Sequence, residues 1–185
     1  MKPDTAKTNL ILIGMPGSGK SLVSDMATEK GAIIVSMGDI VREEAKKRGE
    51  SSKETAKNLR AEFGQYIVAE LTIKKIKKLI EEGIENSIVV EGIRSPHEVE
   101  MFKENFDNFL IVSIFANPTL RFERLKLRKR EDDSTDYNVF KARDETELGF
   151  GLGSVISLSD KMIVNESDIE SCCKEITEYF DEIEL

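Results

Sequence analysis

Cysteine, histidine and tryptophan are almost absent from this sequence. Its 185 residues include two cysteines, one histidine and no tryptophan. The cysteines, Cys172 and Cys173, are adjacent, which makes a poor structural disulfide, and no other cysteine or nearby histidine completes a metal site. The histidine, His97, is expected in an exposed position at the start of a helix. We therefore expect reduced thiols and neither a disulfide framework nor a zinc centre.

Long apolar runs and net positive charge are also missing. The longest apolar run, residues 109–116, is interrupted by Ser113 and is far too short to span a bilayer. Because no secretory segment is recognised, we expect a cytoplasmic protein without a membrane partner. The formal net charge of −8 argues against broad nucleic-acid binding, although the basic residues crowded within residues 121–130 keep an RNA partner open. The oligomeric state is left open.

The most specific motif follows the apolar run at residues 10–13. The next eight residues, Gly-Met-Pro-Gly-Ser-Gly-Lys-Ser, fit the phosphate-binding pattern G-x-x-x-x-G-K-[ST]. Its glycines let backbone N–H groups curl around a phosphate at the positive end of the following helix. Lys20 is predicted to reach the β- and γ-phosphates of ATP, and Ser21 to ligate Mg²⁺. The predicted nucleotide site consists of Gly14, Met15, Pro16, Gly17, Ser18, Gly19, Lys20 and Ser21.

Short apolar segments alternate with amphipathic ones along the chain. We expect strands at residues 9–13, 32–35, 87–91, 109–115 and 161–164. Helices are expected between them, and Ser51 with Glu54 and Ser95 with Glu98 have the spacing of capping boxes. This alternation predicts an α/β fold of the P-loop NTPase class, with about five parallel strands flanked by helices.

The segments at the carboxyl ends of the expected strands, where parallel sheets bind ligands, resemble those of adenylate kinases. Residues 14–20 match their Gly-x-Pro-Gly-Ser-Gly-Lys, and residues 36–42 resemble their Ser-Thr-Gly-Asp-Leu-Leu-Arg. Residues 91–94 are similar to the Asp-Gly-Phe-Pro-Arg segment of adenylate kinases, shortened by one residue. Residues 122–128 resemble the arginine-bearing helix that leads into their lid. Over residues 9–180 the chain most resembles the archaeal adenylate-kinase-related P-loop proteins, within the nucleoside monophosphate kinase-like and dephospho-CoA kinase-like P-loop kinases.

This resemblance implies an ATP-dependent kinase. The γ-phosphate of Mg²⁺-bound ATP would pass to a small phosphorylated acceptor, with a nucleoside monophosphate as the first candidate. Residues 1–185 would form one domain, with a helical acceptor-binding insertion at about 38–84 and a short lid at about 129–142. The lid would close to exclude water, which competes as a phosphate acceptor.

The resemblance also implies roles for residues near the acceptor and the metal. Arg42 and Arg94 would bind the acceptor, and the planar group of Arg94 suits bidentate contact with a phosphate. Asp39 would lie near the substrate and reach Mg²⁺ through water, and Glu91 would hold Mg²⁺ through water opposite Ser21. Plainer alternatives are a helix cap for Asp39, a solvated helix face for Arg42 and an exposed strand end for Glu91.

Three further arginines acquire implied roles on the donor side. Arg124 would stack on the donor base, and Arg128, on the same helix face, would contact its phosphates. Arg143 would move in with the lid and stabilise charge on the transferred phosphoryl group. Lys20, Arg128 and Arg143 are therefore the predicted catalytic residues. The alternative for the basic helix is a surface docking patch.

Two departures from adenylate kinases keep other functions open. Met37 stands where they have threonine, and no glutamine occupies the place that recognises the acceptor adenine. One alternative is therefore a nucleotide-binding switch or slow ATPase that acts with a protein or RNA partner. Another is a kinase for dephospho-CoA or a similar metabolite, because residues 159–165 are reminiscent of the end of dephospho-CoA kinases.

Overall fold

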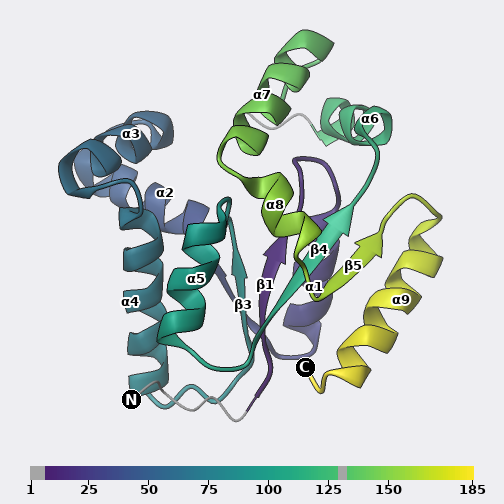
Figure 1. Cartoon of the computed structure of the whole chain (residues 1–185), viewed down its shortest axis with the longest axis horizontal. Coiled ribbons are helices and arrows are strands. Elements are labelled where there is room, and N and C mark those ends of the chain that lie inside the picture. Colours follow the sequence, from purple (N-terminus) through teal and green to yellow (C-terminus); the bar gives the residue numbers. More distant parts are fainter. Residues whose placement is uncertain (1–6, 129–132) are drawn as a thin grey trace.

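Five short strands form one parallel sheet at the centre of the computed structural model, which describes residues 7–128 and 133–185 (Figure 1). The strands are β1 (Asn9–Ile13), β2 (Ile33–Ser36), β3 (Ile88–Glu91), β4 (Phe109–Phe115) and β5 (Lys161–Val164). Their order is β2-β3-β1-β4-β5, so β1 lies in the middle with β3 and β4 beside it. The predicted α/β fold with five parallel strands is confirmed.

Helices cover both faces of this sheet. In the described residues they are α1 (Lys20–Glu29), α2 (Met37–Arg48), α3 (Ser52–Phe63), α4 (Ile67–Glu81), α5 (Pro96–Asn105), α6 (Pro118–Arg128), α7 (Tyr137–Gly149), α8 (Leu152–Ser157) and α9 (Ile169–Glu182). α1 and α9 pack on one face, and α4, α5 and α8 on the other. α6 and α7 lie at the same end of the molecule as the loop between β1 and α1 (Figure 1). None of these helices combines the length and apolar character that crossing a membrane requires.

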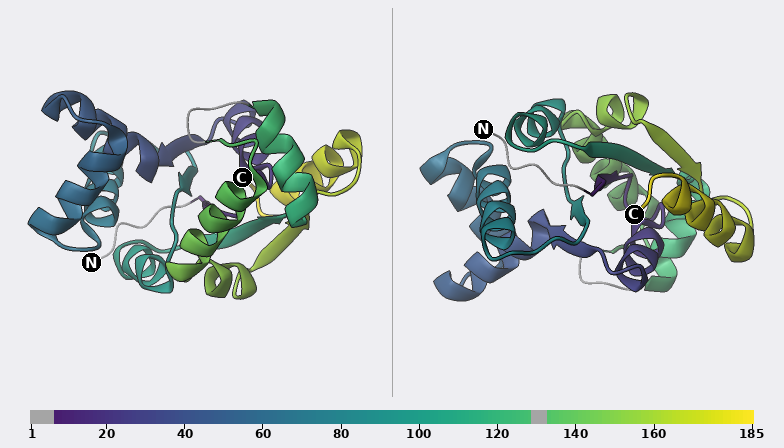
Figure 2. Two further views of the ribbon diagram at one scale, coloured as in Figure 1. Left: turned by 90° about the horizontal axis from the view of Figure 1, so that it is seen from above. Right: turned by 90° about the horizontal axis from the view of Figure 1, so that it is seen from below.

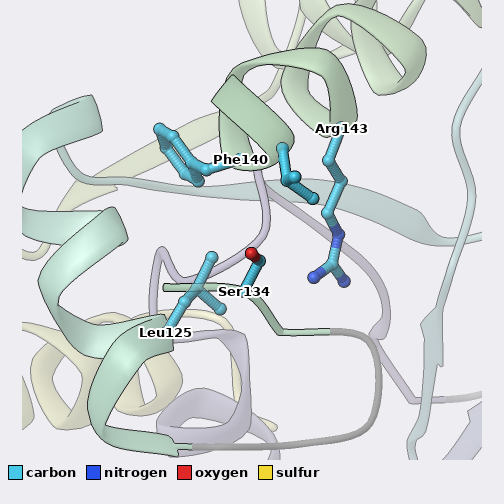
Figure 3. A pocket seen from close by; sticks show the side chains of 5 residues that line it. Leu125, Ser134, Phe140 and Arg143 are labelled. Carbon is cyan, nitrogen blue, oxygen red and sulfur yellow. The ribbon is translucent and has the colours of Figure 1, made fainter. Parts of the chain in front are cut away.

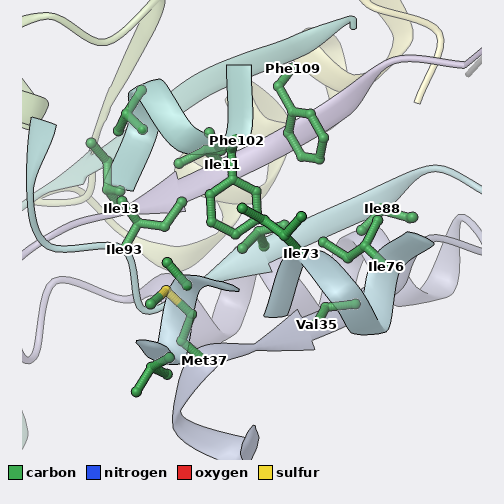
Figure 4. Close-up of a cluster of buried hydrophobic side chains, with 14 of the residues drawn as sticks. Ile11, Ile13, Val35, Met37, Ile73, Ile76, Ile88, Ile93, Phe102 and Phe109 are labelled. Atoms are coloured by element: carbon green, nitrogen blue, oxygen red, sulfur yellow. The ribbon is translucent and has the colours of Figure 1, made fainter. Parts of the chain in front are cut away.

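The central strand β1 is buried along its whole length, which explains why its sequence is a continuous apolar run. Successive side chains of a strand point to opposite faces. Leu10 and Leu12 therefore pack in the core shared with α1 and α9. Ile11 and Ile13 pack in the core on the other face, among side chains of α4 and α5 such as Phe102 (Figure 4). The P-loop therefore follows the central, fully buried strand of the sheet.

The helices α2, α3 and α4 follow β2 in one stretch and project from the β2 side of the sheet (Figure 2). The predicted capping boxes are confirmed, with Ser51 and Glu54 at the start of α3 and Ser95 and Glu98 at the start of α5. A helix cap of this kind stabilises a protein by about 1 kcal/mol. The use of this region to bind an acceptor stays a prediction.

Part of the predicted lid, residues 129–132, lies outside the described residues, and the chain beyond it is more helical than its sequence suggests. α7 begins at Tyr137, and the Asp136 side chain caps it by accepting a hydrogen bond of 2.7 Å from the Asn138 N–H. Phe140 is the one buried residue of this helix. A single buried position gives almost no apolar helical period, so hydrophobic periodicity alone does not mark a helix here.

Candidate phosphate-binding site

The loop between β1 and α1 turns tightly because two of its positions lack side chains. Gly17 and Gly19 have φ angles of 82° and 106°, which other residues rarely adopt. A Cβ on Gly17 would lie 2.8 Å from the carbonyl oxygen of Arg121. A Cβ on Gly19 would lie 2.1 Å from Nδ2 of Asn165. Neighbouring backbone and side chains therefore close around this loop, which we call the P-loop (residues 14–21).

Lys20 is the first residue of α1, and its amine folds back into the P-loop. Nζ donates hydrogen bonds to the carbonyl oxygens of Gly14, at 2.6 Å, and Met15, at 3.3 Å. Burial lowers the pKa of Lys20 from 10.5 to about 8, although the charges of Glu91 and Glu147 act to raise it. The amine is thus held beside the loop backbone, in a position that phosphate oxygens could share.

Charged side chains from several elements act on the Lys20 amine. Glu91 and Glu147 attract it, and Arg94 and Arg128 oppose its charge. These groups come from the end of β3, the segment after β3, the end of α6 and α7. The sequence predicted Glu91, Arg94 and Arg128 as site residues, and their charges act on the lysine, while their roles stay predictions. The sequence did not predict Glu147.

Two serines of the P-loop test whether the loop fits a phosphate. The Ser18 hydroxyl is buried and has no hydrogen-bond partner within the part of the chain that the structure describes. Buried hydroxyl groups are normally paired, and a phosphate oxygen would supply the missing partner. Ser21 is exposed in the first turn of α1. An unsatisfied hydroxyl, a glycine turn and a folded-back lysine together fit a bound phosphate group.

Glu91 is the carboxylate best placed for a metal beside the P-loop. It ends β3 opposite Leu12 of β1, and its Oε1 accepts a hydrogen bond from the hydroxyl of Ser24, one turn beyond Ser21. Within residues 7–128 and 133–185 no group of three or more histidine, cysteine or acidic side chains could hold a metal ion. Mg²⁺ bound mainly through phosphates and water needs only one or two protein ligands, so Ser21 and Glu91 fit that mode.

Asp39 and Arg42 form an ion pair on the first turns of α2. Arg42 donates to Oδ1 of Asp39 from Nε at 3.0 Å and from Nη2 at 2.5 Å. Both side chains are more than half exposed, at 53% for Asp39 and 61% for Arg42. Met37 before them is buried, and a Cβ on Gly92 would lie 3.0 Å from the Met37 Cβ. The start of α2 therefore packs against the segment that leaves β3, while the predicted roles of Asp39 and Arg42 stay predictions.

Arg94 lies between a carboxylate and an aromatic ring. Its Nε is 3.4 Å from Oε2 of Glu147, whose side chain is 12% exposed. Its guanidinium carbon lies 5.8 Å from the centre of the Phe150 ring. Both partners belong to α7 or its end, so this helix contacts the segment after β3.

Arg124 is fixed against the P-loop by an asparagine from beyond β5. Its Nη2 donates to the carbonyl oxygen and to Oδ1 of Asn165, at 3.0 and 3.2 Å. Asn165 in turn donates from Nδ2 to the Ser18 carbonyl oxygen at 2.9 Å. The structure thus brings the predicted base-binding arginine to the loop, and Asn165, which the sequence did not single out as a site residue, connects the two.

The structure brings Arg128 and Arg143 together on one buried carboxylate. Arg128 donates to Asp133 from Nε at 2.8 Å and from Nη2 at 2.6 Å, and Arg143 Nη1 lies 3.3 Å from the same group. The Asp133 side chain is only 2% exposed. Arg143 also lines a small pocket between α6 and α7, with Leu125 and Phe140 among its walls (Figure 3). Asp133 was missed from the sequence because it sits in a polar run without a recognisable motif.

Arg121 connects the P-loop to α7. It is 3% exposed and donates from Nη1 to the carbonyl oxygen of Pro16 at 3.1 Å. The same guanidinium group binds Asp144 with two hydrogen bonds, of 2.9 and 2.5 Å. The guanidinium carbon also lies 5.1 Å from the centre of the Phe140 ring. Together with Arg124 and Arg128, Arg121 makes contacts inside the molecule, which weakens the docking-patch alternative for this helix.

The sheet order, the P-loop and the flanking helices define a P-loop domain with a kinase-like fold. A family model described as an AAA domain matches residues 13–141. A UPF0200 protein of Methanothermobacter thermautotrophicus is 49% identical over 164 residues, which cover 87% of this chain and 84% of that protein. A UPF0200 protein of Pyrococcus furiosus is 47% identical over 164 residues, which cover 85% of this chain and 87% of that protein. The chain belongs to the UPF0200 family and carries this AAA domain.

A solved structure shares this fold. Shikimate kinase from Bacteroides thetaiotaomicron aligns with a TM-score of 0.61 at 15% identity, covering 96% of this chain and 99% of that chain. Identity this low shows the fold alone. The predictions of a kinase-like P-loop fold and of an archaeal P-loop family are confirmed.

Proposed function

We propose that this protein is an ATP-dependent phosphotransferase that transfers the γ-phosphate to a small phosphorylated acceptor. The observation that carries this proposal is the P-loop, where the Lys20 amine donates to the Gly14 carbonyl oxygen and Arg124 of α6 donates to the Ser18 carbonyl oxygen. Phosphoryl transfer depends on positioning and on stabilising negative charge, and cationic groups from separate elements can supply both. A nucleoside monophosphate is the first candidate acceptor. The unbridged cysteines suit a cytoplasmic location.

The donor nucleotide would bind at the P-loop. Backbone N–H groups and the N-terminus of α1 would hold its phosphates, and the buried Ser18 hydroxyl would gain a partner. Ser21 and Glu91 would hold Mg²⁺, which neutralises charge on the β- and γ-phosphates when bound. Arg124, which Asn165 fixes beside the loop, would present its planar group to the donor base.

The acceptor would bind to the side chains of Arg42 and Arg94. The terminal amino groups of Arg94 have the geometry for bidentate contact with a phosphate, while its Nε contacts Glu147. Asp39 would orient Arg42 and reach the metal through water. These contacts would hold the acceptor phosphate close to the γ-phosphate that Lys20 binds.

Arg128 and Arg143 would stabilise charge on the transferred group. Their shared contact with Asp133 keeps both side chains in one place, so little reorganisation is needed when charge develops. The same contact supports a second candidate function. In a nucleotide switch or slow ATPase, a protein or RNA partner would release the two arginines from Asp133.

A product screen tests the proposal. The protein would be incubated with Mg²⁺ and γ-labelled ATP, together with each nucleoside monophosphate, with dephospho-CoA, or with no acceptor. We expect label on one acceptor, and no label transfer by the Lys20→Ala variant. Label released only as free phosphate, equally in every reaction, would contradict a kinase and favour the slow ATPase.

A further inference from the structure

Glu147, near the end of α7, was not predicted as a site residue and has no role in the proposed function so far. Its side chain is 12% exposed, and its Oε2 lies 3.4 Å from Nε of Arg94. Glu145, on the same helix, is 66% exposed and lies 3.9 Å from the Lys141 amine. Glu147 therefore faces the candidate site, whereas Glu145 faces solvent.

The position of Glu147 is fixed by groups from two sides. Arg94 is held between the Glu147 carboxylate and the ring of Phe150, which follows α7. Asp144, three residues before Glu147, binds Arg121, which donates from Nη1 to the carbonyl oxygen of Pro16 in the P-loop. Glu147 therefore lies on the face of α7 that contacts both the proposed acceptor arginine and the P-loop, where donor and acceptor would meet.

A carboxylate in this position suits one class of acceptor better than another. If the attacking atom is a phosphate oxygen, no base is needed, and a fixed negative charge repels both donor and acceptor. If the attacking atom is a hydroxyl oxygen, a carboxylate within hydrogen-bond reach can orient the O–H group and take its proton. The placement of Glu147 beside Arg94, on the face of α7 that contacts the P-loop, favours the second class.

The geometry points to Glu147 as the general base for an acceptor that attacks through a hydroxyl group, so that the product is a phosphate monoester and not a phosphoanhydride. This inference rests on the proposed function and narrows its acceptor. An anionic group of the acceptor binds Arg94, and its hydroxyl group lies between Glu147 and the γ-phosphate. Dephospho-CoA, which carries both groups, is a better candidate on this ground than the phosphate of a nucleoside monophosphate.

ATP and the acceptor supply every atom and electron pair that this transfer needs. The hydroxyl proton passes to the Glu147 carboxylate as the hydroxyl oxygen forms a bond to the γ-phosphorus. The bond between the γ-phosphorus and the β,γ-bridging oxygen breaks, and its electron pair leaves with ADP. Glu147 then releases the proton to solvent. Water, which also has an O–H group, follows the same route when no acceptor is bound.

The linkage in the product gives the first test. Label from γ-labelled ATP would be traced with nucleoside monophosphates, dephospho-CoA and water as acceptors, and products would be heated in acid, which cleaves phosphoanhydrides and spares phosphate monoesters. We expect acid-stable label on an organic acceptor. Acid-labile label on a nucleoside monophosphate would overturn the inference and leave the proposed kinase function intact.

Variants of Glu147 give the second test, on the same reactions. Glu147→Gln should lower kcat about 100-fold, because a general base contributes about that much, and should leave the KM for ATP nearly unchanged. Glu147→Asp should keep more activity than Glu147→Gln. Glu145→Gln is the matched control and should turn over ATP at the wild-type rate, since that side chain faces solvent.

The outcomes separate this inference from the function on which it rests. If folded Glu147→Gln, checked by MgATP binding and thermal unfolding, turns over ATP at the wild-type rate or faster, Glu147 only occupies Arg94 and the inference is wrong. In that case wild-type label transfer still supports a phosphotransferase. If the wild-type protein transfers the γ-phosphate to none of the acceptors, the proposed function fails and the inference fails with it.

Discussion

At the scale of single residues, Gly19 is the P-loop glycine whose added Cβ would lie closest to another atom. Gly19→Ala would combine a φ angle of 106° with a Cβ 2.1 Å from Asn165 Nδ2. Asn165 would have to move, and it holds both the Ser18 carbonyl oxygen and Arg124. We expect the free energy of unfolding to fall by about 2 kcal/mol and MgATP affinity to drop at least about tenfold. Urea unfolding and calorimetric titration would measure the two effects.

Gly83→Ala is the matched control for this prediction. Gly83 has a φ angle of 86°, but no atom lies within 4 Å of the Cβ that it would gain. The variant should therefore lose less stability than Gly19→Ala, because only the positive φ angle is unfavourable for alanine there. It should bind MgATP as the wild type does. Equal losses of affinity in both variants would contradict the close packing inferred for Gly19.

Titration of the Lys20 amine should make protein stability and MgATP affinity depend on pH in opposite directions. Its pKa of about 8 in the folded protein, against 10.5 as the ordinary value, means that the unfolded chain binds more protons between these limits. The stability of the nucleotide-free protein should therefore rise with pH across this window. Binding of a phosphate needs the charged amine, so the Kd for MgATP should increase about tenfold between about pH 7 and pH 9.

Calorimetry in buffers of different ionisation enthalpy would measure this dependence. Near pH 9 the wild-type protein should take up a proton when it binds MgATP, because the amine must regain its charge. Lys20→Arg keeps its charge over this range, so it should show neither proton uptake nor the tenfold change. The same pH profile in Lys20→Arg and wild type would assign the titration to another group.

Some site residues could be predicted from the sequence and others could not, for a physical reason. Lys20 and Ser21 stand at fixed spacing in a local turn, so adjacent residues determine their geometry. Asp133 and Glu147 act through partners that the chain brings together only on folding, and each lies in a run of acidic and polar residues. The inward face of α7 does carry a signal, since Phe140, Asp144 and Glu147 recur at helical spacing.

At the scale of elements, α7 is held to the P-loop by the ion pair of Arg121 and Asp144. Asp144→Ala should lower the free energy of unfolding by about 3 kcal/mol, because the buried Arg121 charge loses its partner. The double variant Arg121→Met with Asp144→Leu should regain most of this stability by apolar packing. The double variant should bind MgATP more weakly than the wild type, because Arg121 no longer donates a hydrogen bond to the Pro16 carbonyl oxygen. Urea unfolding and nucleotide titration separate the two effects.

The control for this pair lies on the same helix. Lys141 and Glu145 are both 66% exposed and 3.9 Å apart, so Glu145→Ala should leave stability nearly unchanged. An Asp144→Ala variant as stable as Glu145→Ala would mean that the buried pair does not anchor α7.

Strands were more predictable than α7 because different forces specify them. β1, β3 and most of β4 are buried on both faces, so their sequences are apolar runs that stand out from the charged chain around them. The capping boxes at Ser51 and Ser95 are local and were predicted for the same reason that the P-loop was. α7 has a local cap at Asp136, but its packing depends on Phe140 and Asp144, whose contacts only the folded chain supplies.

At the scale of the whole molecule, the distribution of charge matters more than its sum. The formal net charge is −8, yet Lys20, Arg94, Arg124 and Arg128 gather where the P-loop meets α6 and α7. An acidic protein that concentrates arginines and a lysine at one end of its sheet is suited to a compact polyanion and not to an extended one. A nucleotide with its phosphates is the ligand that this arrangement fits best.

Titration of MgATP into the wild-type protein and Lys20→Ala is the most direct test of nucleotide binding at the P-loop. We expect saturable binding by the wild type and at least about tenfold weaker binding by Lys20→Ala, equivalent to about 1.4 kcal/mol, from a variant that stays folded. Equal affinities in the two proteins, or no binding by folded wild-type protein, would contradict nucleotide binding at this loop.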